Sequence, residues 1–199
     1  MSSGILNREF YAQDTVVVAQ KLLGRILTVK SEHGTIQGRI VETEAYLTGD
    51  PASHTFRGKT ARNAVMFGPA GHAYVYFSYG SHYMLNFVSA SEGLGEAVLI
   101  RALEPVAGID LMRHNRVVDT RTPDWKLCAG PGRLAKALGI TRSAYNGLDL
   151  CNPDSLITVI DAPEVESSVV IASPRIGISQ GTEHLWRYYV NGCPAVSRR

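Results

Sequence analysis

Strand-forming segments follow one another in runs along this chain, and their order limits the fold more than any other feature. These segments are short, rich in β-branched and aromatic residues, and bounded by Gly, Ser or Asn. Because strands and helices do not alternate, we expect an α+β fold with a mostly antiparallel sheet and helices beside it. The pattern predicts strands at Arg25–Lys30, Thr35–Tyr46, His72–Phe77, Tyr83–Ser89, Ala97–Glu104, Leu156–Ile160, Val169–Ala172 and Trp186–Val190.

Helix signals lie between these runs. Asp14 has the side chain of an N-cap, and Gly24 and Gly139 suit the position just after a helix end. Thr60 is a second expected cap, and Pro105 is tolerated in a first turn. Residues 47–60 and 117–126 read as loops. The expected helices are Asp14–Gly24, Thr60–Met66, Pro105–Arg116 and Pro131–Leu138.

Composition excludes several classes of protein. The chain has 199 residues, of which 45% are apolar and 19% charged, so it can build a real core as one domain. No apolar run approaches the roughly 20 residues that span a bilayer. The N-terminus lacks the apolar segment of a signal peptide, so we expect a cytoplasmic protein with no membrane partner.

The cysteines and histidines show no metal-binding spacing. Cys128, Cys151 and Cys193 lie far apart and form no CxxC pair, and the six histidines form no HExxH motif. We therefore expect buried free thiols and no metal. The net charge of +2 is only mildly basic and does not by itself identify a nucleic-acid partner.

Two carboxylates alternate in the segment Arg39–Tyr46, RIVETEAY. Alternate side chains of a strand share a face, which predicts one face carrying Ile40, Glu42, Glu44 and Tyr46. Like charges this close disfavour each other, so one carboxyl needs a partner or has a raised pKa. The pattern fits the solvated face of an edge strand as well as a catalytic face, and it does not choose between Glu42 and Glu44.

Four tyrosines lie close together in HAYVYFSYGSHYMLN, which runs from His72 to Asn86. Tyrosines commonly fill half-buried strand faces, and this accounts for Tyr74 and Tyr83. Tyr79 instead falls in the short loop beside Gly80, where an aromatic side chain gains little burial. We therefore expect Tyr79 to project outward.

Basic and aromatic side chains are mixed in the loop Ser53–Asn63. The mixture fits phosphate contacts combined with base stacking, and it fits a solvated loop equally well. The Gly-rich turn at Gly130–Leu134 fits either a phosphate site or a simple helix start. The cations of the loop are Arg57, Lys59 and Arg62.

Together these segments resemble the alkyladenine DNA glycosylases, the 3-methyladenine DNA glycosylases of the mammalian type that bacteria also have. The family's order and spacing recur in RIVETEAY, His54, residues 62–67, YVYFSYG, Asn86 and LIRALEP at Leu99–Pro105. The likeness continues through LCAGPGRLAKALGI, PRIGIS and YYVNGCPAVS, so it covers nearly the whole chain. It implies one α+β domain, residues 1–199, with a curved antiparallel sheet and no metal or cofactor.

The resemblance also implies roles for matching residues. Glu44 becomes the general base that activates a water to attack C1′ of the damaged nucleotide. Arg101 and the backbone carbonyl of Ile176 become the other groups that hold this water. Glu42 is then read as structural support.

The remaining implied roles concern DNA. Asn86 would exclude the 2-amino group of guanine, and Tyr79 would enter the minor groove and fill the gap left by a flipped base. Tyr46, His54 and Tyr76 would form the walls of the base pocket. Contacts with the DNA backbone are expected from Arg57, Lys59 and Arg62.

These roles predict a DNA repair glycosylase that acts as a monomer on double-stranded DNA near the nucleoid. It would flip out alkylated or deaminated purines such as 3-methyladenine, hypoxanthine or ethenoadenine and leave an abasic site. A glycoside hydrolase that uses Glu42 and Glu44 is disfavoured, because carboxyls at i and i+2 lie side by side and do not flank a bond. A non-catalytic nucleic-acid-binding module remains the alternative, and it would not need Glu44.

Overall fold

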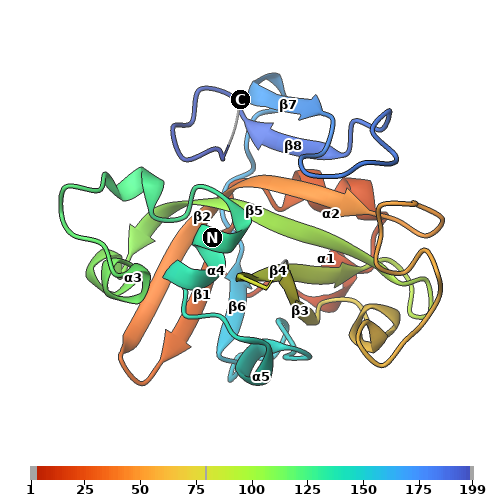
Figure 1. Ribbon diagram of the computed structural model, residues 1–199, viewed down its shortest axis with the longest axis horizontal. Helices are drawn as coiled ribbons and strands as arrows, with labels where there is room; N and C mark the ends of the chain where they lie inside the picture. The colour runs from red at the N-terminus through yellow and green to blue at the C-terminus, as the bar shows by residue number, and fades with distance from the viewer. Residues whose placement is uncertain (1–3, 79, 198–199) are drawn as a thin grey trace.

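The computed structural model describes residues 4–78 and 80–197 (Figure 1). Within these residues all paired strands are antiparallel and form one curled sheet in the order β3-β4-β5-β2-β1-β6, with β8 beside β2 and β7 beside β8. The expected α+β class is confirmed. The strands are β1 (Ile26–Ser31), β2 (Gly34–Tyr46), β3 (Ala73–Ser78), β4 (His82–Ser89), β5 (Glu96–Ala107), β6 (Ile157–Ile160), β7 (Val170–Ser173) and β8 (Arg187–Val190).

Strand β2 is central and joins three neighbours. Its first half pairs with β1 through a tight turn, in which Ser31 lies opposite Gly34. The far end of the same edge pairs with β8, with Glu42 opposite Tyr189. Its other edge pairs with β5. The alternative that Glu42 and Glu44 lie on a solvated edge strand is therefore wrong.

A β-bulge interrupts β2 at Val41. Ile40 lies opposite Leu103, and Glu42 lies opposite the adjacent residue Ala102, so Val41 is an extra residue. The bulge breaks the strict alternation of faces. Ile40 packs in the main hydrophobic core, whereas Glu42 lies among arginines. The prediction that Ile40 shares a face with Glu42 was wrong for this reason.

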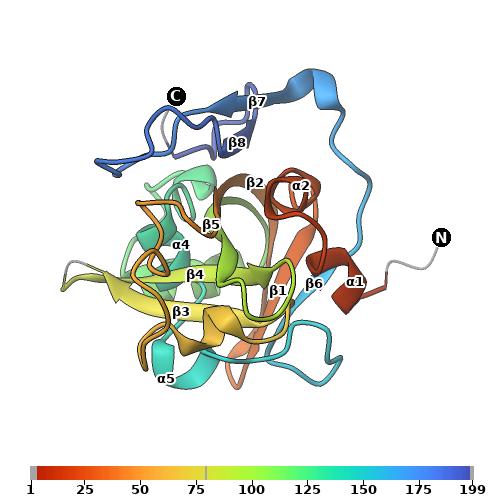
Figure 2. The same ribbon diagram turned by 90° about the vertical axis from the view of Figure 1, so that its right-hand side faces the viewer.

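The helices are short and lie around the sheet. In both views the β7–β8 hairpin occupies one end of the molecule, beside α2, and α5 lies at the opposite end (Figures 1 and 2). The α-helices are α1 (Arg8–Tyr11), α2 (Thr15–Lys21), α3 (Ile109–Arg116), α4 (Pro131–Ala137) and α5 (Arg142–Tyr145). Single 3-10 turns occur at η1 (Ala64–Phe67), η2 (Asp124–Lys126) and η3 (Ser167–Val169).

Three helix ends agree with the capping signals. The Asp14 carboxylate accepts hydrogen bonds from the N–H groups of Val16 and Val17, at 2.9 and 3.1 Å, and so caps α2. Gly24 and Gly139 have φ values of +86° and +67°, which side chains with a Cβ rarely adopt. Both glycines therefore turn the chain after a helix, as predicted.

The helix predicted from Pro105 was wrong in its first part. Pro105 lies in β5 opposite Gly38, next to a register shift, where its missing N–H is tolerated. The sheet thus extends to Ala107, and Gly108 in the left-handed conformation separates it from α3. Pairing with β2 prevails over the helix-start preference of proline.

The helix predicted from Thr60 is reduced to η1. The Asn63 amide donates to the backbone carbonyls of His54 and Gly58, at 2.9 and 3.1 Å. These bonds fold the preceding loop into successive turns. The helical segment therefore begins only at Ala64.

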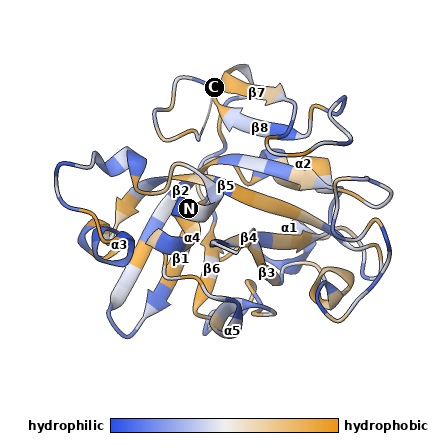
Figure 3. Ribbon diagram, in the orientation of Figure 1, coloured by the Kyte–Doolittle hydropathy of each residue, from blue (hydrophilic) through white to orange (hydrophobic). Residues whose placement is uncertain are grey.

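The main core is built from the strands and the helices that pack on them. Figure 3 shows hydrophobic residues concentrated on the central strands and α2, and hydrophilic residues in the outer loops. Large, completely buried side chains include those of Tyr11, Leu22, Phe87 and Leu103. Of the helices in the described residues, none has the length and apolar character required to cross a membrane.

Candidate active site

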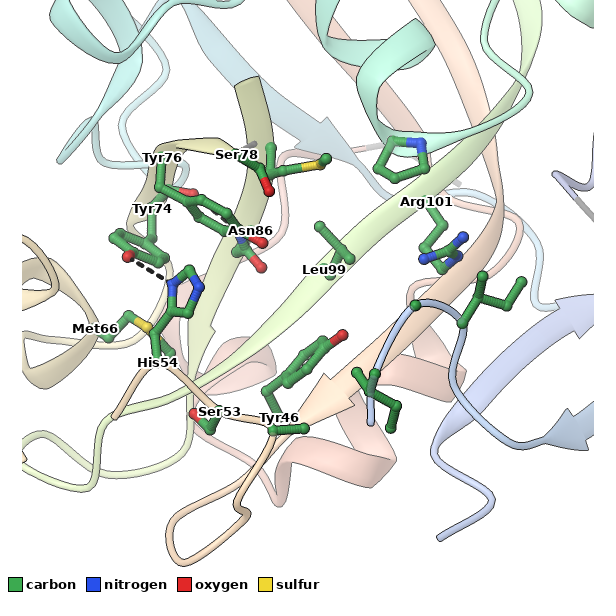
Figure 4. A pocket seen from close by; sticks show the side chains of 16 residues that line it. Tyr46, Ser53, His54, Met66, Tyr74, Tyr76, Ser78, Asn86, Leu99 and Arg101 are labelled. Carbon is green, nitrogen blue, oxygen red and sulfur yellow. Dashed lines mark hydrogen bonds between the residues drawn. The ribbon is translucent and has the colours of Figure 1, made fainter. Parts of the chain in front are cut away.

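A cavity of about 300 Å³ opens beside the C-terminal half of β2 (Figure 4). This volume is at the lower end of the range of pockets that hold small molecules. Its walls come from β2, β3, β4 and β5, from the loop after β2, and from the start of α4 and the loop after β7. The lining residues are Tyr46, Ala52, Ser53, His54, Met66, Tyr74, Tyr76, Ser78, Met84, Asn86, Leu99, Arg101, Pro131, Ile176, Gly177 and Ile178.

Aromatic side chains form opposite walls of this cavity. Figure 4 shows Tyr46 on one side and the cluster of His54, Tyr74 and Tyr76 on the other. The centres of the His54 and Tyr76 rings are 4.3 Å apart, and His54 Nδ1 lies 3.1 Å from the Tyr74 hydroxyl. The structure thus brings together the three residues expected to line a base pocket. It adds Tyr74, which is buried as expected but also lines the cavity.

Asn86 lies on β4, between Tyr74 of β3 and Leu99 of β5. Its side chain is buried and lines the cavity. The amide nitrogen donates to the backbone carbonyl of Tyr74 at 3.2 Å. This bond fixes the orientation of the amide.

Glu44 lies behind the cavity wall rather than in it. Its side chain is completely buried, and three cavity-lining residues contact it. The Tyr46 hydroxyl donates to Oε2 at 2.9 Å, the Ile176 N–H donates to Oε1 at 2.8 Å, and Arg101 Nη1 lies 3.2 Å from Oε1. Burial raises the pKa of Glu44 above its ordinary value, although Arg101 and the hydrogen bonds act in the opposite direction.

Ile176 contacts the carboxylate in a way that the resemblance did not imply. The resemblance assigned a role to its backbone carbonyl. The observed contact uses the backbone N–H instead. The loop after β7 therefore holds Glu44 directly.

Glu42 is also completely buried, and both of its oxygens are hydrogen-bonded. Oε1 accepts from Arg187 Nε at 2.7 Å, from Arg101 Nε at 3.0 Å and from the Ser197 hydroxyl at 2.9 Å. Oε2 accepts from the Ser197 N–H at 2.7 Å. Arg187 and Ser197 were not among the site residues expected from the sequence. Buried carboxylates require cationic partners, but nothing in the sequence marks which arginine supplies them.

Arg101 joins the two carboxylates because of a second bulge. It is an extra residue on β5, since Ile100 and Ala102 pair with the consecutive residues Thr43 and Glu42 of β2. A bulge redirects a side chain relative to its neighbours. Here the guanidinium reaches both carboxylates and also lines the cavity.

The expected cations of the loop after β2 differ in their surroundings. Arg62 donates to the backbone carbonyl of Phe77 at 3.1 Å and lies 6.0 Å from the centre of the Tyr76 ring. Arg57 and Lys59 are exposed. Partial burial, together with Arg62, lowers the pKa of His54, which favours the neutral form of its ring. Tyr79 lies outside the described residues.

One glycine of the Gly-rich segment Gly130–Leu134 is explained by packing, namely Gly132 in the first turn of α4. A Cβ on Gly132 would lie 2.6 Å from the His82 ring, so this glycine allows α4 to approach the β3–β4 hairpin. Across residues 4–78 and 80–197, no cluster of His, Cys, Asp or Glu side chains has a geometry that could hold a metal ion.

Comparison with known proteins identifies the family. The family model described as methylpurine-DNA glycosylase (MPG) matches residues 9–194. A provisionally named 3-methyladenine DNA glycosylase of Methanoculleus marisnigri is 50% identical over 96% of this chain and 97% of its own length. Proteins with the same name from Chlorobaculum tepidum and Carboxydothermus hydrogenoformans are each 44% identical, over 97% and 98% of this chain and 90% and 100% of their own. The chain therefore belongs to the methylpurine-DNA glycosylase family.

Proposed function

We propose that this protein removes damaged purines from duplex DNA by hydrolysing the N-glycosidic bond, with Glu44 as the general base. Family membership supports the DNA glycosylase activity. The observation that carries the proposal is a buried carboxylate directly behind an aromatic cavity, held by Tyr46, Arg101 and Ile176. A base inside a duplex cannot reach such a cavity, so the damaged nucleotide is rotated out, at a cost of a few kcal/mol.

The cavity walls suit a cationic purine. N-alkylated purines such as 3-methyladenine carry a positive charge, and the ring face of Tyr46 or Tyr76 favours a cation by about 0.5–2 kcal/mol per good contact. The lowered pKa of His54 favours its neutral ring, which does not repel a cationic base. Hypoxanthine and ethenoadenine are neutral, so their binding in the cavity relies on shape and on stacking against the aromatic rings.

Glu44 accepts a proton from the water as the water oxygen bonds to C1′. The C1′–N bond breaks, and the leaving purine keeps the electron pair, which neutralises an alkylated base. A neutral purine such as hypoxanthine leaves as an anion and takes up one proton from the solvent. Arg101 and the Ile176 backbone border the place of this water. Tyr46, Arg101 and Ile176 cover Glu44 in the free protein, so bound DNA must open one of these contacts to admit the water.

Water is the nucleophile in this proposal because no lysine is among the described residues that line the cavity. The product is then an abasic site in an uncut strand. Trapping of a covalent protein–DNA adduct with borohydride would contradict this step. Such an adduct requires a Schiff base between an amine of the protein and C1′.

The test uses duplex oligonucleotides that carry one hypoxanthine or ethenoadenine, with alkali cleavage of abasic sites. We expect Glu44→Gln to lower the excision rate by about 100-fold or more while DNA binding is kept. Glu104→Gln is the control, because it makes the same change in an exposed carboxylate on β5. Excision by Glu44→Gln at the unchanged rate would refute the role of Glu44. Binding without excision by the unchanged protein would favour a non-catalytic module.

A further inference from the structure

We infer that Arg175 is a positioning residue for Glu44, and that its ion pair with Asp50 holds in place the two neutral donors bound to that carboxylate. This inference rests on the proposed role of Glu44 as the base. Arg175 does not line the cavity, so it acts through other residues. Neither Arg175 nor Asp50 was among the site residues expected from the sequence.

Arg175 and Asp50 form a completely buried pair. Both terminal nitrogens of the guanidinium donate to the carboxylate, Nη1 to Oδ2 and Nη2 to Oδ1, the latter at 2.9 Å. Nη1 also donates to the Ala45 carbonyl at 3.0 Å, on β2. On the other side of the pair, the Ala52 N–H donates to Oδ1 of Asp50, also at 3.0 Å. The pair therefore fastens the loop after β7 to the end of β2 and to the loop that follows it.

Arg175 reaches both neutral donors of Glu44. Through the chain it precedes Ile176, whose N–H donates to Oε1 at 2.8 Å. Through its side chain it lies over the ring of Tyr46, 4.7 Å from the centre, and the Tyr46 hydroxyl donates to Oε2 at 2.9 Å. The guanidinium also lies 5.1 Å from the centre of the Trp186 ring. One side chain thus fixes the donors on both oxygens.

The physical effect of such a pair is geometry rather than stability. A buried ion pair often contributes no more stability than apolar residues of the same volume. The bidentate fork, however, allows only one orientation of the guanidinium. A shift of the loop by an ångström would lengthen the bond from Ile176 and tilt the ring of Tyr46.

Loss of these donors has a defined electrostatic sign. Hydrogen bonds to a carboxylate favour its charged form, so their loss raises the pKa of Glu44 further. Other charged or titratable groups also face Glu44 or its neighbours and must stay unchanged in the test. They are Arg101 and Glu42 directly, Tyr76 beside Tyr46, and Arg187 through Glu42.

The test uses two variants that conserve charge. Arg175→Lys keeps the cation but lacks the fork, and Asp50→Glu keeps the anion but moves it by one methylene. We expect single-turnover excision at neutral pH to fall by about 10- to 100-fold, as for a misplacement of about 1 Å. We expect the acidic limb of the pH profile to move upward by about one pH unit. The Kd for lesion-containing DNA should change by a much smaller factor than the excision rate.

Arg25→Lys is the matched control. Arg25 is mostly buried and pairs with Asp161 at 2.5 Å and Glu164 at 3.1 Å, and it does not line the cavity. This variant should keep both the excision rate and the acidic limb. An acidic limb that stays in place in Arg175→Lys and Asp50→Glu would overturn the inference.

Further measurements separate the possible failures. If thermal melting shows that Arg175→Lys does not fold, the excision rate and the acidic limb of Asp50→Glu test the inference instead. In a double-mutant cycle with Tyr46→Phe, Arg175→Lys should lower the excision rate by a smaller factor once the Tyr46 hydroxyl is absent. Strictly additive effects of the two substitutions on the activation free energy would count against the inference. If Glu44→Gln still excises bases, the proposed function itself fails. If Glu44→Gln is inactive while the acidic limb stays in place, only the role of Arg175 fails.

Discussion

At the scale of single residues, the acid–base state of Glu44 results from opposing effects. Burial raises its pKa, while Arg101 and the hydrogen bonds from Ile176 and Tyr46 favour the charged form, and burial prevails. A general base must be deprotonated. We therefore expect excision to fall as the pH drops through a value above the ordinary 4.5 of a glutamate. Single-turnover excision against pH measures this, and an acidic limb at or below that value would contradict it.

The same pKa shift has a consequence for stability. Because the pKa of Glu44 is higher in the folded than in the unfolded state, the folded state holds the proton more tightly. Its contribution to stability is complete below the unfolded pKa and is lost as the pH rises through the folded pKa. As the pH rises through this range, the unfolding free energy of Glu44→Gln should fall less than that of the unchanged protein. Urea unfolding at a series of pH values measures this, and an equal fall in both proteins would contradict it.

Asn86 is the residue at which selectivity against guanine is expected. Its amide is held against the cavity by the Tyr74 carbonyl. Asn86→Ala should raise excision of normal guanine by about 10-fold, the factor that small steric differences in pockets give. Asn115→Ala is the control, because Asn115 makes a similar amide bond to the Ala137 carbonyl and does not line the cavity. Unchanged guanine excision in Asn86→Ala would refute the expected role of Asn86 in excluding guanine.

At the scale of elements, the end of β5 depends on Gly108. This residue has φ +74°, and a Cβ there would lie 2.6 Å from the Thr35 carbonyl. Gly108→Ala should lower the unfolding free energy by about 2–4 kcal/mol, since strain and overpacking add. Gly49→Ala isolates the strain, because Gly49 has φ +80° and no atom within 4 Å of the added Cβ. We expect Gly49→Ala to lower the unfolding free energy by only about 1 kcal/mol. Equal losses in urea unfolding would mean that the close approach has no effect.

The pairing of β2 with β5 determines how the elements build the site. One bulge places Val41 outside the register of β2, and the other does the same for Arg101 on β5. Together they direct Arg101 toward both carboxylates. A regular ladder would have kept Arg101 on the alternation of its neighbours.

At the scale of the whole molecule, the weak net charge of +2 makes local cations important for DNA binding. The DNA-binding constant K falls with salt, and each cation that contacts a phosphate makes the slope of log K against log salt steeper by about 0.9. Arg57→Ala and Lys59→Ala should each reduce the slope by about this amount. Lys30→Ala, in which the lost ammonium is bound to the Pro153 carbonyl, should leave it unchanged. If Arg57→Ala and Lys59→Ala kept the slope of the unchanged protein, both residues would be excluded from the DNA interface.

The sequence by itself determined what depends on neighbouring residues. Local backbone preferences made three kinds of feature predictable. These were the positions of most strands along the chain, the Asp14 cap, and the glycines after α2 and α4. The motifs also named residues that the structure gathers at one cavity, among them Tyr46, His54, Tyr76, Asn86, Arg101 and Ile176. That residues 1–199 form a single domain stays a prediction.

Only the tertiary structure decided how the two carboxylates differ. Alternation treats Glu42 and Glu44 alike, but their partners come from distant segments. Glu42 is enclosed by Arg187 and Ser197, whereas Glu44 meets the Ile176 N–H behind the cavity. Burial, and with it the raised pKa of Glu44, depends on which strands pair and where they bulge. No local pattern carries that information, because the free energy of such contacts is set by segments far apart in the chain.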